Sequence, residues 1–152
     1  MKRSFALVAI ALLALSALPV AAQAKFSIGP TAGVLKVMDE DATFLRFGAS
    51  ARLSLLRLLA LRIDARYVMM PGEEDTWVDA AAGVEVPILL GLYAKAQGGY
   101  FLDPSGKSNF PYIEAGLGFG IGGLFVEGVY SQLFVESGAG TFGASAGFRF
   151  KL

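Results

Sequence analysis

The C-terminal stretch Gly140–Leu152, GTFGASAGFRFKL, decides the fold. Apolar residues occupy its even positions from Phe142 to Leu152, whereas glycine, serine, threonine, arginine and lysine occupy its odd positions. Strict alternation with a period of two predicts a β-strand with one apolar and one polar face. The polar face consists mainly of very small residues, so we expect other parts of the chain to lie close above it. A narrow β-barrel interior provides such crowding.

The first 24 residues are organised like a secretory signal peptide. Lys2 and Arg3 form a basic head, an apolar run follows from Phe5 to Leu18, and Ala22-Gln23-Ala24 fits the A-x-A cleavage rule. An uncleaved anchor is the less favoured alternative, because the apolar run is short for spanning a bilayer. We therefore predict a signal peptide at 1–24 and one domain at 25–152.

Composition excludes several classes of function. Two of the 13 basic residues lie in the signal peptide, which leaves 11 against 13 acidic residues and no basic excess for nucleic acid. Cysteine is absent, so the exported domain is not a disulfide scaffold. Histidine is absent as well, which removes the general base of most hydrolytic sites.

Seven further alternating segments precede the closing one. With it, the predicted strands are 26–37, 43–55, 59–70, 76–88, 92–102, 110–121, 124–135 and 140–152. Polar connections centre near residues 40, 73, 106 and 138, and short ones near 57, 90 and 122. A repeat of 32 or 33 residues also suggests ankyrin repeats, but this chain lacks their helices and signature. An even number of strands with long loops at one end favours a membrane barrel.

One stretch also allows a helix. Leu53–Leu61, LSLLRLLAL, contains no turn residue and could begin a helix that continues through Arg66. The alternation on both sides keeps its phase through a short turn near residues 56–58, so strands are the favoured interpretation.

Alternation alone leaves two orientations open, with the apolar faces inward around an apolar ligand, as in a soluble lipocalin-like barrel, or outward into lipid. Three features favour the outward orientation. The central apolar faces carry no charge, glycine is abundant on the polar faces, and the polar-face charges nearly balance. The predicted lumen charge network consists of Arg46, Arg52, Arg62, Arg66, Lys95 and Arg149 with Asp64, Asp79, Glu85, Glu114 and Glu127.

The hairpin centres predict which lumen residues face each other across neighbouring strands. The expected pairs are Arg66 with Asp79, Glu85 with Lys95, and Glu127 with Arg149. The same register sets Arg52 against Arg62, which requires Asp64 or Glu85 to lie diagonally between the two arginines.

The whole chain after the signal peptide resembles the small eight-stranded outer-membrane barrels of the OmpA/OmpX-like kind. The resemblance rests on the signal peptide, the hairpin spacing and the terminal strand. It implies an all-β fold, an eight-stranded antiparallel up-and-down transmembrane β-barrel, located in the bacterial outer membrane. Outer-membrane lipid and, through the C-terminal strand, the barrel-assembly machinery are the implied partners. The chain ends in Phe150-Lys151-Leu152, whereas the family usually ends in phenylalanine.

Several short motifs have a plainer interpretation than the one they suggest. Gly143–Gly147 matches G-x-S-x-G, but Ser145 lacks the following helix and the histidine that a nucleophile needs. Gly118–Gly123 contains G-x-G-x-x-G, which is better explained by a strand running into a hairpin turn. The acidic runs 39–41 and 73–75 could bind divalent cations, although solvated loop charges are the default.

We therefore predict an integral outer-membrane barrel with a structural or cell-surface interaction role. It is expected to be a non-enzymatic, essentially non-conducting monomer without cofactor, metal or nucleic acid. A soluble lipocalin-like binder of an apolar ligand is the first alternative, and a narrow pore is the second. Tyr67, Tyr100, Tyr130 and Phe134 are expected to form an aromatic girdle near the loop ends.

Overall fold

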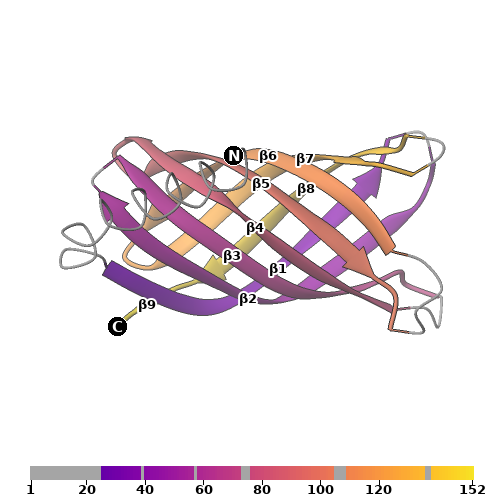
Figure 1. Ribbon diagram of the computed structural model, residues 1–152, viewed down its shortest axis with the longest axis horizontal. Helices are drawn as coiled ribbons and strands as arrows, with labels where there is room; N and C mark the ends of the chain where they lie inside the picture. The colour runs from indigo at the N-terminus through magenta and orange to yellow at the C-terminus, as the bar shows by residue number, and fades with distance from the viewer. Residues whose placement is uncertain (1–24, 39, 57, 73–75, 105–108, 136–137) are drawn as a thin grey trace, which may run out of the picture.

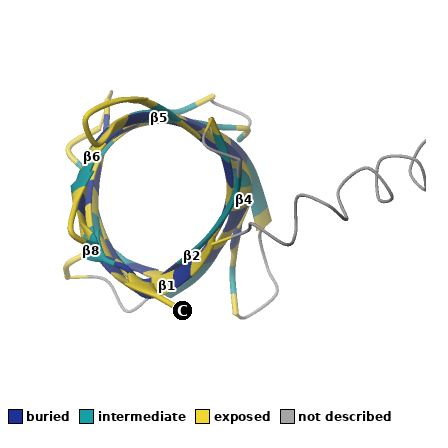
Figure 2. Cartoon of the chain, turned by 90° about the vertical axis from the view of Figure 1, so that its left-hand side faces the viewer, coloured by how far each residue is buried: buried dark blue, intermediate teal, exposed yellow. Residues whose placement is uncertain are grey.

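The strands form one closed antiparallel sheet in the computed structural model, which describes residues 25–38, 40–56, 58–72, 76–104, 109–135 and 138–152. They are β1 (Lys25–Val37), β2 (Thr43–Leu56), β3 (Leu59–Met69), β4 (Thr76–Leu89), β5 (Leu92–Leu102), β6 (Asn109–Ile121), β7 (Leu124–Leu133), β8 (Gly140–Phe148) and β9 (Phe150–Lys151). Each strand from β1 to β7 pairs with the next along the chain, and β1 pairs with β2 on one side and with β8 and β9 on the other. The sheet therefore closes into a barrel (Figures 1 and 2).

The last two elements are one strand interrupted at Arg149. Gly147 lies opposite Thr31 and Phe150 lies opposite Ile28, so β8 and β9 pair with β1 in the same register. Pro30 faces the interruption and has no N–H to donate. The Arg149 N–H instead donates to the Gly123 carbonyl at 2.8 Å. The predicted eight-stranded, up-and-down antiparallel barrel is confirmed.

The alternative helix at Leu53–Arg66 is wrong. β2 runs to Leu56 and β3 begins at Leu59. In β3, Leu61 and Ile63 are exposed while Arg62 is buried, an alternation that only an extended chain produces. Within the described residues there is no helix long and apolar enough to cross a membrane.

The predicted centre of the last hairpin is wrong by two residues. Glu127 lies opposite Ser145, which places the centre at residue 136 rather than 138. The hydrogen bonds of this connection agree with the centre at 136, since the N–H of Leu133 donates to the Ala139 carbonyl and the N–H of Gly138 to the Val135 carbonyl, both at 2.9 Å. A shift of this size keeps every side chain on its predicted face, since the side-chain period is two.

The register sets the dimensions of the barrel. Directly opposed residues trace a path once around the sheet, through Ser27, Arg52, Arg62, Gly83, Gln97, Glu114, Ser131 and Thr141 to Val37. The path returns to β1 ten residues beyond its start at Ser27, and ten is even, so the inward and outward faces match on closure. Eight strands with this stagger tilt by about 40° and enclose a backbone radius of about 8 Å. Side chains fill an interior of that radius.

The apolar side chains lie mostly on the outside of the barrel. Among the described residues, 29 large apolar side chains are exposed and only ten apolar residues are buried. A soluble monomer rarely exposes an apolar patch larger than a few hundred Å². The barrel therefore has the orientation that the outward alternative predicts, and the orientation of a soluble binder with an apolar interior is wrong for most of its length.

Glycines on the lumen face let neighbouring strands and side chains approach. A Cβ atom added to Gly83 would overlap the carbonyl oxygen of Ala96 and the Cα of Gln97, both on β5. A Cβ added to Gly128 on the outward face of β7 would meet nothing within 4 Å. A methyl group added at Gly83 should therefore destabilise the barrel, whereas one added at Gly128 should not.

We expect Gly83→Ala to lower the free energy of unfolding by about 1 to 3 kcal/mol, because β4 and β5 must separate locally. Gly128→Ala is the matched control, and it should leave stability unchanged or raise it slightly. Urea unfolding in detergent micelles, followed by the fluorescence of Trp77, the only tryptophan, measures both. Equal effects of the two substitutions would contradict the assignment of the faces.

Candidate functional site

The predicted lumen charges occupy the middle of the barrel and its short-turn end. Ten of the eleven are buried, and they are Arg46, Arg62, Asp64, Arg66, Asp79, Glu85, Lys95, Glu114, Glu127 and Arg149. Arg52, whose side chain is 24% exposed, lies at the short-turn opening. The buried set contains five cations and five carboxylates, as enclosed charges require, because an unpaired buried charge is costly.

Asp79 and Glu114 organise the part of the network nearer the loops. Asp79 pairs with Arg66 at 2.7 Å and accepts a hydrogen bond from the Tyr112 hydroxyl at 2.5 Å. Glu114 pairs with Arg46 at 2.9 Å and with Lys95 at 2.8 Å. The residues in these contacts lie on five successive strands, β2 to β6. Some of the contacts therefore cross the interior, and others link neighbouring strands.

Glu127 organises the part nearer the short turns. It pairs with Arg62, and with Lys95 at 2.9 Å, so Lys95 links the two parts of the network. It also accepts hydrogen bonds from the hydroxyls of Tyr93 at 2.6 Å and Ser145 at 3.1 Å. Every oxygen of this buried carboxylate therefore has a donor, which offsets its desolvation.

Two of the predicted cross-strand pairs have the expected register. Arg66 lies opposite Asp79 and forms an ion pair with it. Glu85 lies opposite Lys95, but the ammonium group pairs instead with Glu114, a diagonal neighbour on β6, and with Glu127 on β7. A long lysine chain in a narrow barrel has carboxylates from several strands within reach.

Of the other two predictions, the direct opposition of Glu127 and Arg149 is wrong and that of Arg52 and Arg62 is confirmed. Glu127 and Arg149 are not directly opposed, because of the shifted hairpin, although their side chains lie 3.7 Å apart. Arg52 faces Arg62. Glu85 reduces the repulsion between the two arginines, because it pairs with Arg52 at 2.6 Å and lies 3.7 Å from Arg62.

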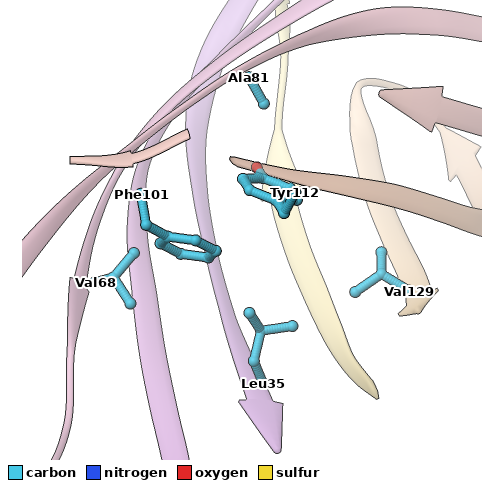
Figure 3. Packing of buried hydrophobic residues seen from close by; sticks show 6 residues of the cluster. All are labelled: Leu35, Val68, Ala81, Phe101, Tyr112 and Val129. Atoms are coloured by element: carbon cyan, nitrogen blue, oxygen red, sulfur yellow. The ribbon is translucent and has the colours of Figure 1, made fainter. Parts of the chain in front are cut away.

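Sequence reasoning missed an apolar plug at the loop end of the lumen. Its buried residues are Leu35, Val68, Ala81, Phe101, Tyr112 and Val129, which point toward one another from different strands (Figure 3). Trp77 and Phe44 pack against the plug, with their rings edge to face at 6.1 Å. The signal was present in the parity, since Leu35 continues the lumen face of β1 and Phe101 that of β5.

The short motifs have the plainer interpretation. Ser145 lies buried within β8 rather than at a strand-to-helix turn, and its hydroxyl donates to Glu127, which is already paired with Arg62 and Lys95. Gly122 and Gly123 form the two-residue turn between β6 and β7, both with positive φ. Within the described ranges, no three acidic side chains are grouped as a metal site would need. The acidic positions 39 and 73–75 lie outside those ranges.

Aromatic residues lie where a girdle is expected. Tyr67, Tyr100, Tyr130 and Phe134 are all about half exposed on the outward surface near the loop ends of β3, β5 and β7. Tyr67 stacks on Phe47 of the neighbouring strand at 6.0 Å. Aromatic rings at this level are typical of membrane–water interfaces.

Comparison with solved structures shows the fold. A de novo designed transmembrane β-barrel matches with a TM-score of 0.63 at 13% identity, covering 83% of this chain and 95% of the design. The outer membrane protein Ail of Yersinia pestis, in a phospholipid bilayer nanodisc, matches with a TM-score of 0.55 at 14% identity, covering 83% and 99%. Neisserial surface protein A matches with a TM-score of 0.54 at 12% identity, covering 85% and 97%.

No protein-family model and no curated protein sequence matches the chain. The structural matches have identities well below 25%, so they establish a fold that this chain shares with small transmembrane barrels.

The Arg66–Asp79 pair can be tested separately from the rest of the network. Without Arg66, Asp64 keeps Arg62 at 3.0 Å, and without Asp79, Arg46 keeps Glu114. We expect Asp79→Leu to cost about 3 to 5 kcal/mol, because it leaves Arg66 buried without its nearest partner, and the double substitution Arg66→Met/Asp79→Leu to cost much less.

Urea unfolding in micelles measures this cycle. Lys36→Gln is the control, since Lys36 and Asp41 form an exposed ion pair at 3.4 Å and its loss should change little. A double variant that is as unstable as the sum of its two single variants would contradict a mutually compensating buried pair.

Proposed function

We propose that this protein is an integral β-barrel of the bacterial outer membrane with a structural or cell-surface interaction role. It is proposed to be non-enzymatic and essentially non-conducting, and to reach the membrane through a signal peptide at 1–24. The observation that supports this proposal is an apolar outer surface around an interior that is filled by paired charges and an apolar plug.

The outer surface supports residence in a lipid bilayer. Among the strands of the described chain, Lys36 is the only charged residue on an outward face, and it lies near the loop end. The 11 residues of β3, tilted by about 40°, span about 27 Å, close to the height of the apolar band of membrane barrels. Exposed residues such as Ile63, at 61%, would contact acyl chains.

The interior supports a closed barrel. Ion pairs cross the lumen in the middle, and the plug around Phe101 and Tyr112 closes the loop end except for a pocket of about 230 Å³. Moving an ion past Arg46 or Arg62 requires breaking a buried ion pair, which is costly. A permanently open water path therefore has no support.

Several observations favour a structural or interactive role over catalysis. The chain has no histidine, and the buried acidic groups are engaged with cations or hydroxyls. Closure through β1 and β8 leaves no free strand edge, which supports a monomer. We further propose that the C-terminal strand, where the Leu152 N–H donates to the Phe26 carbonyl at 3.0 Å, is recognised by the barrel-assembly machinery.

Planar-bilayer recording tests the closed state. The refolded protein should add no steady single-channel conductance, because paired charged side chains fill the cross-section in the middle of the lumen. The unfolded chain at the same detergent concentration controls for nonspecific leakage. Reproducible steady currents would contradict the proposal and favour the narrow pore.

A further inference from the structure

A cavity opens at the short-turn end of the barrel, beyond the sealed network. Its volume is about 480 Å³, and it lies among the turn between β4 and β5, the turn between β6 and β7, and the last residues of the chain. Arg52, Glu85 and Arg149 line its inner part, and Lys151 lies at its edge. The cavity therefore combines a charged base with the turns around it.

The base of the cavity has an excess of positive charge. The buried network is balanced by itself, with five cations and five carboxylates. Arg52 and Lys151 add two cations to it, and Glu85 is the only carboxylate among the described residues that line the cavity. Glu85 pairs with Arg52 at 2.6 Å and with Arg149 at 3.2 Å, so two guanidinium groups share one carboxylate.

Arg149 is fixed beneath the cavity. Its guanidinium carbon lies 4.2 Å from the centre of the Phe125 ring, and its side chain is 8% exposed. Its Nη1 pairs with Glu85 at 3.2 Å and its Nη2 lies 3.7 Å from Glu127. Arg52 is more open to the cavity, since its side chain is 24% exposed, and a guanidinium group is suited to binding an oxyanion.

The rim of the cavity is apolar at positions where turns are normally polar. Leu58, Leu90, Ile121 and Leu124 are between 61% and 86% exposed. Leu90 has a φ of 47°, in a two-residue turn where asparagine, aspartate or glycine is usual. An exposed leucine in this strained backbone conformation is unfavourable unless it contacts something apolar.

We propose that this cavity binds the oxyanion head group of an acyl-chain amphiphile, with a phosphate as the probe chemistry. The guanidinium group of Arg52 would contact the oxyanion, Arg149 and Lys151 would add positive charge, and Leu58 and Leu90 would contact the first part of the chain. The cationic base would bind the oxyanion head group, and the apolar rim would contact the acyl chain. A free oxyanion would contact only the base of the cavity.

Titration of the refolded full-length barrel in uncharged detergent micelles tests the proposal, with dodecyl phosphate and inorganic phosphate as separate ligands and calorimetry as the readout. Dodecyl phosphate should bind saturably at one site. Arg52→Gln should weaken it about tenfold, the loss expected for one charged hydrogen-bonding partner. Lys36→Gln, which removes an exposed cation at the opposite end, should leave binding unchanged.

Two further variants keep the test decisive. Lys151→Gln removes an exposed cation at the chain terminus and should weaken binding even if Arg52→Gln does not refold. Leu90→Asn, which suits the positive φ, should weaken dodecyl phosphate but not inorganic phosphate.

Each alternative outcome overturns the proposal. Equal binding of dodecyl phosphate to all variants would mean that it only partitions into the micelle. Equally strong binding of inorganic phosphate, insensitive to Leu90→Asn, would replace the amphiphile site with a site for a free oxyanion.

Discussion

The structure depends on enclosing charges within a barrel about 8 Å in backbone radius. That interior holds side chains but little water, so each buried charge must find its counter-ion within the lumen. Glu127 illustrates the consequence, since it contacts Arg62, Lys95, Tyr93 and Ser145 from three other strands. The same lack of room explains glycine at positions such as Gly83, where a side chain would collide with the neighbouring strand.

The alternation of residue types was sufficient to predict the strands, their order and the face of nearly every side chain. A closed antiparallel sheet converts a period of two directly into inside and outside, so local pattern and global fold agree. The lumen residues could be named for the same reason. Their partners were harder to predict, because Lys95 pairs with Glu114, a diagonal neighbour on β6, and with Glu127 on the strand beyond it, whereas the hairpin register names only directly opposed residues.

Two features could not be predicted from the pattern that was used. The last hairpin centre agrees with hydrogen bonds in its own loop, from the Leu133 N–H to the Ala139 carbonyl and from the Gly138 N–H to the Val135 carbonyl, which an alternation with a period of two does not encode. The apolar plug was overlooked because the polar face was identified by its charges and glycines, although Leu35 and Val68 share its parity. Apolar residues on a lumen face are therefore informative, since they mark the level at which apolar side chains, rather than ion pairs, close the barrel.

A barrel sealed in this way leaves its ends and outer surface for function. Such a role requires the outward face of the barrel to contact lipid. Strand β4 allows a direct test, because Ala80, Ala81 and Ala82 are consecutive. Ala81 is only 5% exposed, whereas its two neighbours are exposed. The measurement is magnetisation transfer from lipid acyl-chain protons to alanine methyl groups, in alanine-methyl-labelled protein in bilayer nanodiscs. Strong transfer to Ala80 and Ala82 with none to Ala81 is the predicted result, whereas transfer to Ala81 alone, or contact of Ala80 and Ala82 with water instead of lipid, would contradict it.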